Sequence, residues 1–246
     1  MVPWVVLLNK LLVAYFAVVI PFYGLLVVAA LWASARYRRL LKSQPMFRFL
    51  RSPLTPPVSI LVPAYNEELS ISESVRSLLQ LEYPALEVIV VNDGSSDRTL
   101  ETLCRDFAMI PAVLAWRPEL PCAAIRGLYL SPQEPRLLVV DKENGGKSDA
   151  LNAGLNFARS PYFCTVDADV VLETDALARV MAPVLNSRAL VLGTGGIVRV
   201  VNGCTVQEGR IRQVRLPPRS LEVLQVIEYL RGFLFGRQGW SASMRC

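Results

Sequence analysis

The chain has 246 residues, of which 52% are hydrophobic, and a formal net charge of +5. This length allows one ordinary domain together with a membrane segment. The sequence contains no histidine, which excludes His-based triads, His general bases and His metal ligands, so any metal must be bound through oxygen. None of the five cysteines is in C-x-x-C spacing, so neither a zinc site nor a disulfide framework is indicated.

The net positive charge belongs to one end of the chain. Seven of the 26 basic residues lie in residues 1–66, which contain no acidic residue, whereas residues 67–246 carry 19 basic and 21 acidic groups. The high pI is therefore typical of a basic collar that faces anionic lipid headgroups. The chain lacks the interleaved basic and aromatic residues of an RNA-binding surface, so no nucleic-acid partner is expected.

Residues 1–35 are predicted to form a membrane anchor. The segment from Leu11 to Ala35 holds no charged residue and is long enough to span about 30 Å of hydrocarbon as a helix. A cleaved signal peptide that ends near Ala33-Ser34-Ala35 and a buried core helix are the alternatives. The basic residues that follow favour a retained, single-pass anchor whose C-terminal side faces the cytoplasm; they are Arg36, Arg38, Arg39 and Lys42.

Residues 36–57 are predicted to be a basic juxtamembrane linker. Leucine and phenylalanine alternate there with basic residues, which is typical of a segment that lies on the bilayer surface. A solvated linker is the open alternative. Pro53, Pro56 and Pro57 then form a stiff boundary at which the globular domain begins.

Strands and helices alternate from Val58 onward. Continuous runs of Val, Ile and Leu are typical of parallel strands buried on both faces, and they occupy residues 58–62, 86–91, 136–140 and 162–166. Helices are predicted over residues 68–81, 97–108 and 147–159, with a further strand near 112–116 and a further helix near 121–130. This order predicts an α/β fold with a doubly wound sheet.

The first polar motif is Tyr65-Asn66-Glu67, which follows the first strand and Pro63. Ligands of open α/β sheets bind where the strands end. A tyrosine at this edge can stack on a flat base, and the Glu67 carboxylate can accept hydrogen bonds from base or ribose groups. The alternative is a helix start with Asn66 as its N-cap.

The second motif, Asn92-Asp93-Gly94-Ser95-Ser96-Asp97, follows the second strand. Asp93 can accept a hydrogen bond from the imide N–H of uracil, a donor that the cytosine ring lacks. Gly94 allows close backbone approach. The alternative is an Asx turn in which Ser96 or Asp97 caps the next helix.

The third motif consists of Lys142 and Gly145-Gly146-Lys147, which follow the strand that ends at Asp141. A Gly-Gly-Lys run before a helix is similar to a phosphate loop. It lacks the G-x-x-x-x-G-K-[ST] spacing, which argues against a P-loop NTPase. Lys147 could offset diphosphate charge or contact the base, and the alternative is a glycine-rich turn with a solvated lysine.

The fourth motif is Asp167-Ala168-Asp169, directly after an apolar strand. Two carboxylates so close together are unfavourable without a cation. Mg²⁺ or Mn²⁺ would relieve this repulsion and bridge to phosphate oxygens, which hard cations prefer. The sequence therefore predicts a divalent metal site that holds a diphosphate.

In order and content the four motifs resemble those of the family 2 inverting glycosyltransferases, from about Val58 to the C-terminus. The similarity is greatest to processive membrane polysaccharide synthases of the poly-N-acetylglucosamine, hyaluronan and cellulose synthase type. The resemblance implies a GT-A fold, a Rossmann-like doubly wound nucleotide-diphospho-sugar transferase domain, in a bacterial-type plasma membrane. It also implies a nucleotide-sugar donor, with uridine as the preferred base, and a polysaccharide or lipid-linked acceptor.

The resemblance also assigns residues. It implies that Asp169 binds the metal directly, and that Asp167 binds the metal and contacts ribose. Lys147 and Asn152 are implied to lie near the nucleotide-sugar. Residues 58–190 would then be the nucleotide-sugar-binding half of the domain.

Residues 191–246 are expected to begin the acceptor side. A hairpin is predicted around Asn202-Gly203, with Glu208-Gly209 as a second turn and a helix over 220–235. The resemblance implies that a Glu-Asp base, a Gln-x-x-Arg-Trp motif and further membrane helices come next, but the chain ends at Cys246. We therefore expect a truncated member that binds the donor. The alternatives are a non-catalytic nucleotide-sugar-binding remnant and a polyprenyl-phosphate glycosyltransferase.

Overall fold

The structure of the chain is a computed structural model. It describes residues 3–43, 55–116, 118–187, 190–196, 201, 203–207 and 210–232. The chain divides into two compact units. The first, named the α/β unit, comprises Met46–Gly195 and Thr205–Gln213, and the second, named the anchor unit, comprises Met1–Pro45, Gly196–Cys204 and Val214–Cys246.

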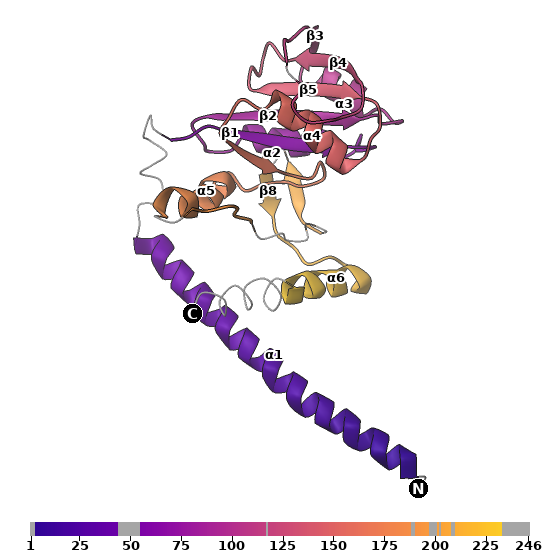
Figure 1. Cartoon of the computed structure of the whole chain (residues 1–246), viewed down its shortest axis with the longest axis vertical. Helices are drawn as coiled ribbons and strands as arrows, with labels where there is room; N and C mark the ends of the chain where they lie inside the picture. Colours follow the sequence, from indigo (N-terminus) through magenta and orange to yellow (C-terminus); the bar gives the residue numbers. More distant parts are fainter. Residues whose placement is uncertain are drawn as a thin grey trace. The chain divides into compact units, whose positions relative to one another are not determined.

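A six-stranded sheet forms the centre of the α/β unit, with the strand order β3-β4-β5-β2-β1-β6 (Figure 1). Strands β1, β2, β5 and β6 are parallel to one another, whereas β4 pairs antiparallel with both of its neighbours, β3 and β5. The bounds are β1 (Val58–Ala64), β2 (Leu86–Asp93), β3 (Ile110–Ala112), β4 (Ile125–Leu130), β5 (Leu137–Lys142) and β6 (Tyr162–Thr165). The four parallel strands are those that the apolar runs predicted.

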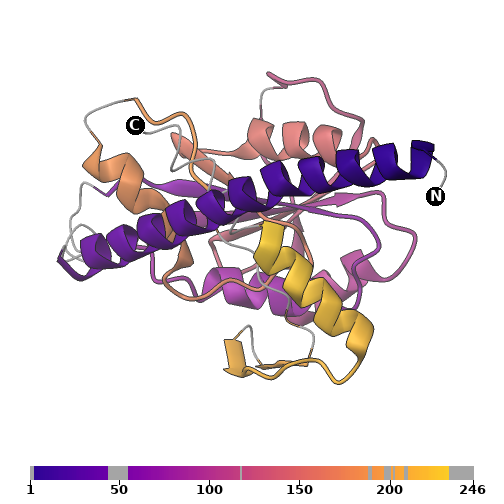
Figure 2. The same ribbon diagram turned by 90° about the horizontal axis from the view of Figure 1, so that it is seen from below.

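Helices cover both faces of this sheet (Figure 2). Alternate side chains of β1 point to opposite faces: Ile60 and Val62 join one apolar cluster, and Leu61 joins the other. The first cluster also receives side chains of α2 (Ile71–Leu79), α3 (Thr99–Asp106) and α5 (Ala176–Asn186), and the second receives those of α4 (Lys147–Phe157). The predicted α/β fold class is therefore confirmed.

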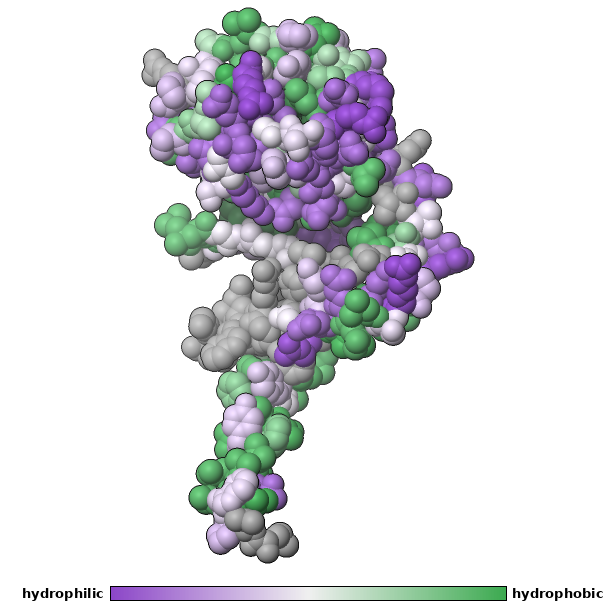
Figure 3. Space-filling model, turned by 90° about the vertical axis from the view of Figure 1, so that its right-hand side faces the viewer, coloured by the Kyte–Doolittle hydropathy of each residue, from purple (hydrophilic) through white to green (hydrophobic). Residues whose placement is uncertain are grey.

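Helix α1 (Pro3–Ser43) belongs to the anchor unit. Its segment Pro3–Trp32 is, among the described residues, the one helix long and apolar enough to cross a membrane, and 6% of that apolar window is buried. Figure 3 shows hydrophobic residues along this helix. Such exposure argues against a buried core helix. The helix continues past Ala35, the predicted end of the anchor, so residues 36–43 of the predicted linker are helical.

One of the predicted elements is wrong, and one predicted strand is displaced. Residues 125–130 form strand β4 and not a helix, because they pair with β5 and alternate between the two faces of the sheet. Leu128 packs in the α4-side cluster, whereas Tyr129 packs against the opposite cluster. The strand predicted near 112–116 is β3, which ends at Ala112.

The C-terminal part contains a short hairpin and a helix. Strands β7 (Thr205–Gln207) and β8 (Arg210–Gln213) pair antiparallel. Residues 208–209, the second predicted turn, lie outside the described residues. The first predicted turn includes Asn202, which lies outside the described residues, as do residues 197–200. The predicted C-terminal helix is present as α6 (Ser220–Arg231), and its predicted last residues, 233–235, are also outside the described part.

The contact between α4 and the sheet depends on a glycine, which gives a prediction about stability. A Cβ atom on Gly154 would lie 3.2 Å from Leu61 Cδ2 and 3.3 Å from Val91 Cγ2. We expect Gly154→Val to destabilise the α/β unit by about 1–3 kcal/mol through overpacking, which lowers the thermal unfolding midpoint of the chain in detergent by roughly 2–10 °C.

The matched control is Ser148→Val, which places the same side chain on an exposed position of the same helix. This variant should leave the midpoint within about 2 °C of the wild-type value, because surface substitutions usually change stability by less than about 0.5 kcal/mol. Equal midpoints for the two variants would contradict the packing argument.

Candidate functional site

A cavity of about 520 Å³ lies at the carboxyl ends of the parallel strands. Strand β1 stands between β2 and β6 in the sheet, so the chain changes direction across the sheet at this point. Open α/β sheets bind ligands at such a switch point. The cavity is lined by Pro63, Ala64, Tyr65, Glu67, Asp93, Asn144, Gly146, Lys147, Ala150, Asp167, Ala168 and Asp169.

The cavity brings together residues of all four polar motifs. Of the eight predicted site residues, seven line it, and the exception is Asn152. The amide of Asn152 donates a hydrogen bond of 3.0 Å to the backbone carbonyl of Pro121, so in this structure it supports a neighbouring loop. Its predicted contact with a nucleotide-sugar stays a prediction.

Tyr65 and Glu67 lie on the loop between β1 and α2. Tyr65 lines the cavity and is 52% exposed. Asn66 does not cap α2, which begins at Ile71 with Ser70 at the N-cap position. It has a positive φ of 58°, and its side-chain oxygen accepts a hydrogen bond of 2.8 Å from the Ser96 N–H.

The loop after β1 and the loop after β2 are joined by further hydrogen bonds. The hydroxyl of Ser95 accepts a bond from the Asn66 N–H, and the Asp97 carboxylate accepts one from the Glu68 N–H. Asp97 also accepts a hydrogen bond from the N–H of Thr99, the first residue of α3, so the Asx turn of the alternative is present, although the N-cap residue of α3 is Arg98 and neither Ser96 nor Asp97. These bonds hold the first two motifs against each other and fix the backbone that carries Tyr65.

Asp93, the last residue of β2, is 3% exposed. Its Oδ1 accepts hydrogen bonds from the Lys142 ammonium and, at 3.0 Å, from the Gly145 N–H, and its Oδ2 accepts one of 2.8 Å from the Gly146 N–H. The loop after β5 thus wraps around this carboxylate. Gly94 has a positive φ of 66°, and a Cβ atom there would lie 2.6 Å from the Asn144 nitrogen, so the close backbone approach expected of Gly94 is to this loop.

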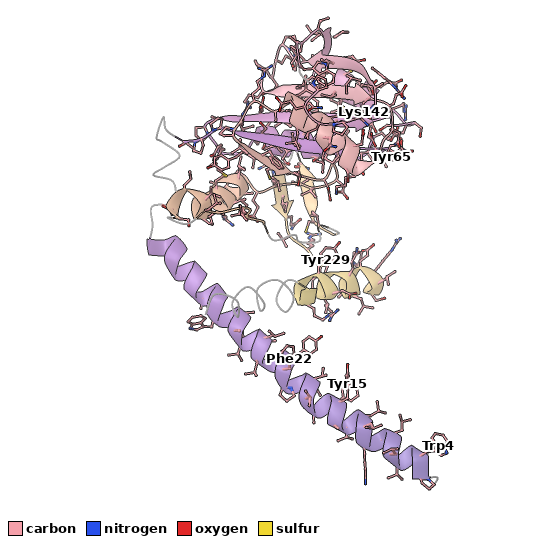
Figure 4. The ribbon with its side chains drawn as sticks, in the orientation of Figure 1. Trp4, Tyr15, Phe22, Tyr65, Lys142 and Tyr229 are labelled. Atoms are coloured by element: carbon pink, nitrogen blue, oxygen red, sulfur yellow. The ribbon has the colours of Figure 1, made fainter. Side chains whose placement is uncertain are left out.

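Lys142 is fully buried at the end of β5 (Figure 4). Its ammonium also forms an ion pair with Asp149 of α4 and donates a hydrogen bond to the backbone carbonyl of Glu143. Burial alone would lower the pKa of Lys142, but the contacts with Asp149 and Asp93 raise it above its ordinary value. The hydrogen bond from Lys142 holds the pKa of Asp149 below its usual range.

The sequence motifs do not predict the pairing of Lys142 with Asp149. Lys142 was grouped with the residues that face a ligand, and Asp149 was not singled out. A signal was present, because Lys142 comes two residues after the continuous apolar run of a strand that the sequence predicts to be buried on both faces. A lysine at such a depth needs carboxylate partners, and Asp149 stands in the first turn of the helix that follows.

Asp167 and Asp169 project from the turn after β6. Val166 and Ala168 are buried, whereas both aspartates are exposed, so alternate residues face the core and the cavity. Lys147, at the start of α4, forms an ion pair of 2.5 Å with Asp167. Both side chains of this pair are more than half exposed, so water and ions reach them.

The two aspartates fit the ligand set of a divalent cation only in part. Among the described residues no group of three or more His, Cys, Asp or Glu side chains could hold a metal. Mg²⁺ usually keeps several waters and is bound by one or two carboxylates together with substrate phosphates. Two exposed carboxylates beside a cavity meet that requirement, provided that a phosphorylated ligand supplies the remaining oxygens.

Comparison with known proteins finds sequence similarity over part of the chain. Over 120 residues, 48% of this chain, it is 33% identical to the poly-beta-1,6-N-acetyl-D-glucosamine synthase of Staphylococcus epidermidis. Over 135 residues, 55% of this chain, it is 32% identical to the chondroitin synthase of Pasteurella multocida. The chain spans 23% and 12%, respectively, of the lengths of these two relatives.

Solved structures were compared as well. A mannosyltransferase from Pyrobaculum calidifontis in complex with GDP-Man and Mn²⁺ is 26% identical, with a TM-score of 0.41; the match covers 64% of this chain and 43% of that one. The family model described as glycosyl transferase family 2 matches residues 59–110 and 122–235. The matched residues make up more than half of the chain and include every residue that lines the cavity. The chain therefore belongs to glycosyl transferase family 2, as its four motifs predicted.

Proposed function

We propose that the α/β unit binds a UDP-sugar together with Mg²⁺ or Mn²⁺, for inverting transfer of the hexosyl group to a growing polysaccharide or a lipid-linked acceptor. The observation that carries this proposal is that one cavity gathers residues of all four motifs at the switch point of the sheet. The sequence relatives named above are polysaccharide synthases by their names, which supports the choice of acceptor class.

The cavity residues divide into three roles. The exposed ring of Tyr65 offers a surface on which the base stacks. The Asp93 carboxylate accepts a hydrogen bond from the base, and Lys147, at the N-terminus of α4, balances diphosphate charge. Asp169 and Asp167 would hold the metal ion, which when bound stabilises the negative charge of the leaving nucleoside diphosphate.

We further propose that α1 anchors the chain in a bacterial-type plasma membrane, with the α/β unit in the cytoplasm. The apolar segment Pro3–Trp32 supports the anchor, since about 20 apolar residues suffice to span a bilayer. The basic residues between Arg36 and Lys42 support the orientation, because such clusters stay on the cytoplasmic side. Nucleotide-sugars and reduced cysteines both fit that compartment.

A second candidate is a donor-binding module that does not transfer the sugar. The described residues that line the cavity include four carboxylates. Asp93 is bonded to Lys142, Glu67 accepts a hydrogen bond from the Ser70 hydroxyl, and the other two are assigned to the metal. With Glu67 assigned to the base or ribose, these roles leave none of the four carboxylates to deprotonate an acceptor hydroxyl, which the transfer reaction requires. Release or transfer of the sugar by this chain would decide against this candidate.

The first prediction concerns the metal. We expect the full chain in detergent to bind UDP in the presence of Mn²⁺, and Asp169→Asn or added EDTA to weaken binding by at least about 10-fold, because disturbing the support of a metal site typically costs about 10–100-fold. Isothermal titration calorimetry measures the affinity.

The control for this prediction is Asp106→Asn, at the end of α3 and outside the cavity. It makes the same chemical change on the same unit and should bind UDP as the wild type does. Equal affinity of wild type and Asp169→Asn for UDP with Mn²⁺ would contradict the assignment of Asp169.

The second prediction separates Lys147 from the metal ligands. Without its ammonium, Asp167 is no longer paired and becomes a better ligand for a free cation. We expect Lys147→Gln to bind Mn²⁺ alone roughly two- to fivefold more tightly, which is the strength of an exposed ion pair, and to bind UDP with Mn²⁺ more weakly.

Electron paramagnetic resonance of free Mn²⁺ measures the first effect, and calorimetry the second. Lys147→Arg keeps the ion pair and serves as the control for both. Weaker binding of Mn²⁺ alone by Lys147→Gln would show that Lys147 supports the metal site and does not compete with it.

A further inference from the structure

The hydrogen-bonding capacity of the buried Lys142 ammonium is fully satisfied within the protein. It has three donors, and the structure gives it three acceptors: Asp93, Asp149 and the Glu143 carbonyl. The side chain is 0% exposed and does not line the cavity. Lys142 therefore cannot bind a ligand in the cavity without giving up one of these contacts, and its effect on a ligand must pass through Asp93, which does line the cavity.

The acceptor sites of Asp93 can be counted. A carboxylate offers about four lone-pair sites, two on each oxygen. Oδ1 accepts from Lys142 and from the Gly145 N–H, and Oδ2 accepts from the Gly146 N–H. One acceptor site remains, on Oδ2. A ligand in the cavity therefore meets a carboxylate that can accept one hydrogen bond and donates none.

We infer that Lys142 is a positioning residue that sets the nucleobase preference of the cavity, because it keeps Asp93 a charged acceptor with a single open site. This inference rests on the proposed binding of a nucleoside diphosphate. Uracil presents one imide N–H and matches the open site. The ring nitrogen of cytosine at the same place carries a lone pair, which a carboxylate repels. Guanine presents two adjacent donors, of which this carboxylate can accept one.

The charge of Lys142 is what maintains this state. Asp93 and Asp149 contact the same ammonium, and two carboxylates that share a site cannot both stay ionised without a cation. Replacement of Lys142 by a neutral side chain would leave Asp93 and Asp149 without this cation, so that one of the two carboxylates would take up a proton from solvent. An Asp93 that carries the proton becomes a hydrogen-bond donor, which suits the ring nitrogen of cytosine and no longer suits the imide of uracil.

The test is the ratio of the dissociation constants for CDP and UDP, measured by calorimetry with Mn²⁺ on the full chain in detergent. We expect the wild type to prefer UDP by about tenfold or more, the range of a hydrogen bond to a charged group. In Lys142→Met the ratio should fall to within about threefold, which reflects the loss of that one bond. Lys142→Gln removes the same charge but keeps polar atoms, and carries the test if the methionine variant does not fold.

Two controls keep the charge of Lys142. Lys142→Arg retains a cation beside Asp93, and Asp149→Asn removes the competing carboxylate while leaving the Lys142–Asp93 pair intact. Both should preserve the preference for UDP. If the role of Lys142 were merely structural, Lys142→Met and Lys142→Gln would weaken the binding of both nucleotides equally. The ratio of the two dissociation constants would then stay unchanged, which would overturn the inference.

The outcome for the wild type separates this inference from the function on which it rests. A wild-type chain that binds neither nucleotide with Mn²⁺ would overturn the proposed function, and the inference with it. A wild-type chain that binds UDP in preference to CDP, with a ratio that the neutral variants retain, would leave the proposed function standing and refute the role of Lys142 alone.

Discussion

One buried cation, Lys142, organises the end of the sheet at which the cavity lies. It joins the last residue of β2 to the first turn of α4, and it stands at the end of β5, between them. A buried ion pair is weak evidence for stability, because desolvation offsets most of the attraction. Its geometric consequence is stronger: Asp93, satisfied by Lys142, also holds the N–H groups of Gly145 and Gly146. This arrangement positions the loop before α4, and it thereby positions Lys147 at the start of that helix.

The opposite side of the cavity is fixed by a second set of polar contacts. Asn66 adopts a left-handed conformation and binds the loop after β2 through the Ser96 N–H, while Asp97 binds the loop after β1 in return. Asn66 and Ser96 are exposed, so these bonds order the surface and do not add to the core. Tyr65 therefore stands on a backbone held on both sides, which limits the entropy that a stacked ligand would cost.

The sequence predicted the parallel strands and the cavity well, because both follow from local patterns. Strands buried on both faces leave continuous apolar runs, and polar residues placed after such runs must meet at one edge of the sheet. Strand β4 was mistaken for a helix, because its two faces contact different apolar clusters and its alternation is broken by a bulge between Ile125 and Gly127. Helix α5 was not predicted, although Leu177, Met181 and Leu185 are in helical spacing, since Pro183 interrupts the pattern. Asp149 lies close to Lys142 in the sequence, but the Asp93 partner of Lys142 and the Pro121 partner of Asn152 lie on chain segments that meet only in the fold, so no local pattern could have given these two contacts.

The charge of the cavity explains why a divalent cation belongs to the proposal. Lys142 is neutralised within the protein by Asp93 and Asp149, so it contributes no positive charge to the cavity. Apart from Asp93, the charged residues among the described cavity residues are one cation, Lys147, and three carboxylates, Glu67, Asp167 and Asp169. The cavity therefore carries more negative than positive charge. A nucleoside diphosphate is itself an anion, and the N-terminus of α4 adds only about half of a positive charge. The repulsion between a diphosphate and these carboxylates would be relieved by a divalent cation that binds to both, so the proposed donor is expected to bind this cavity together with the metal and hardly at all without it.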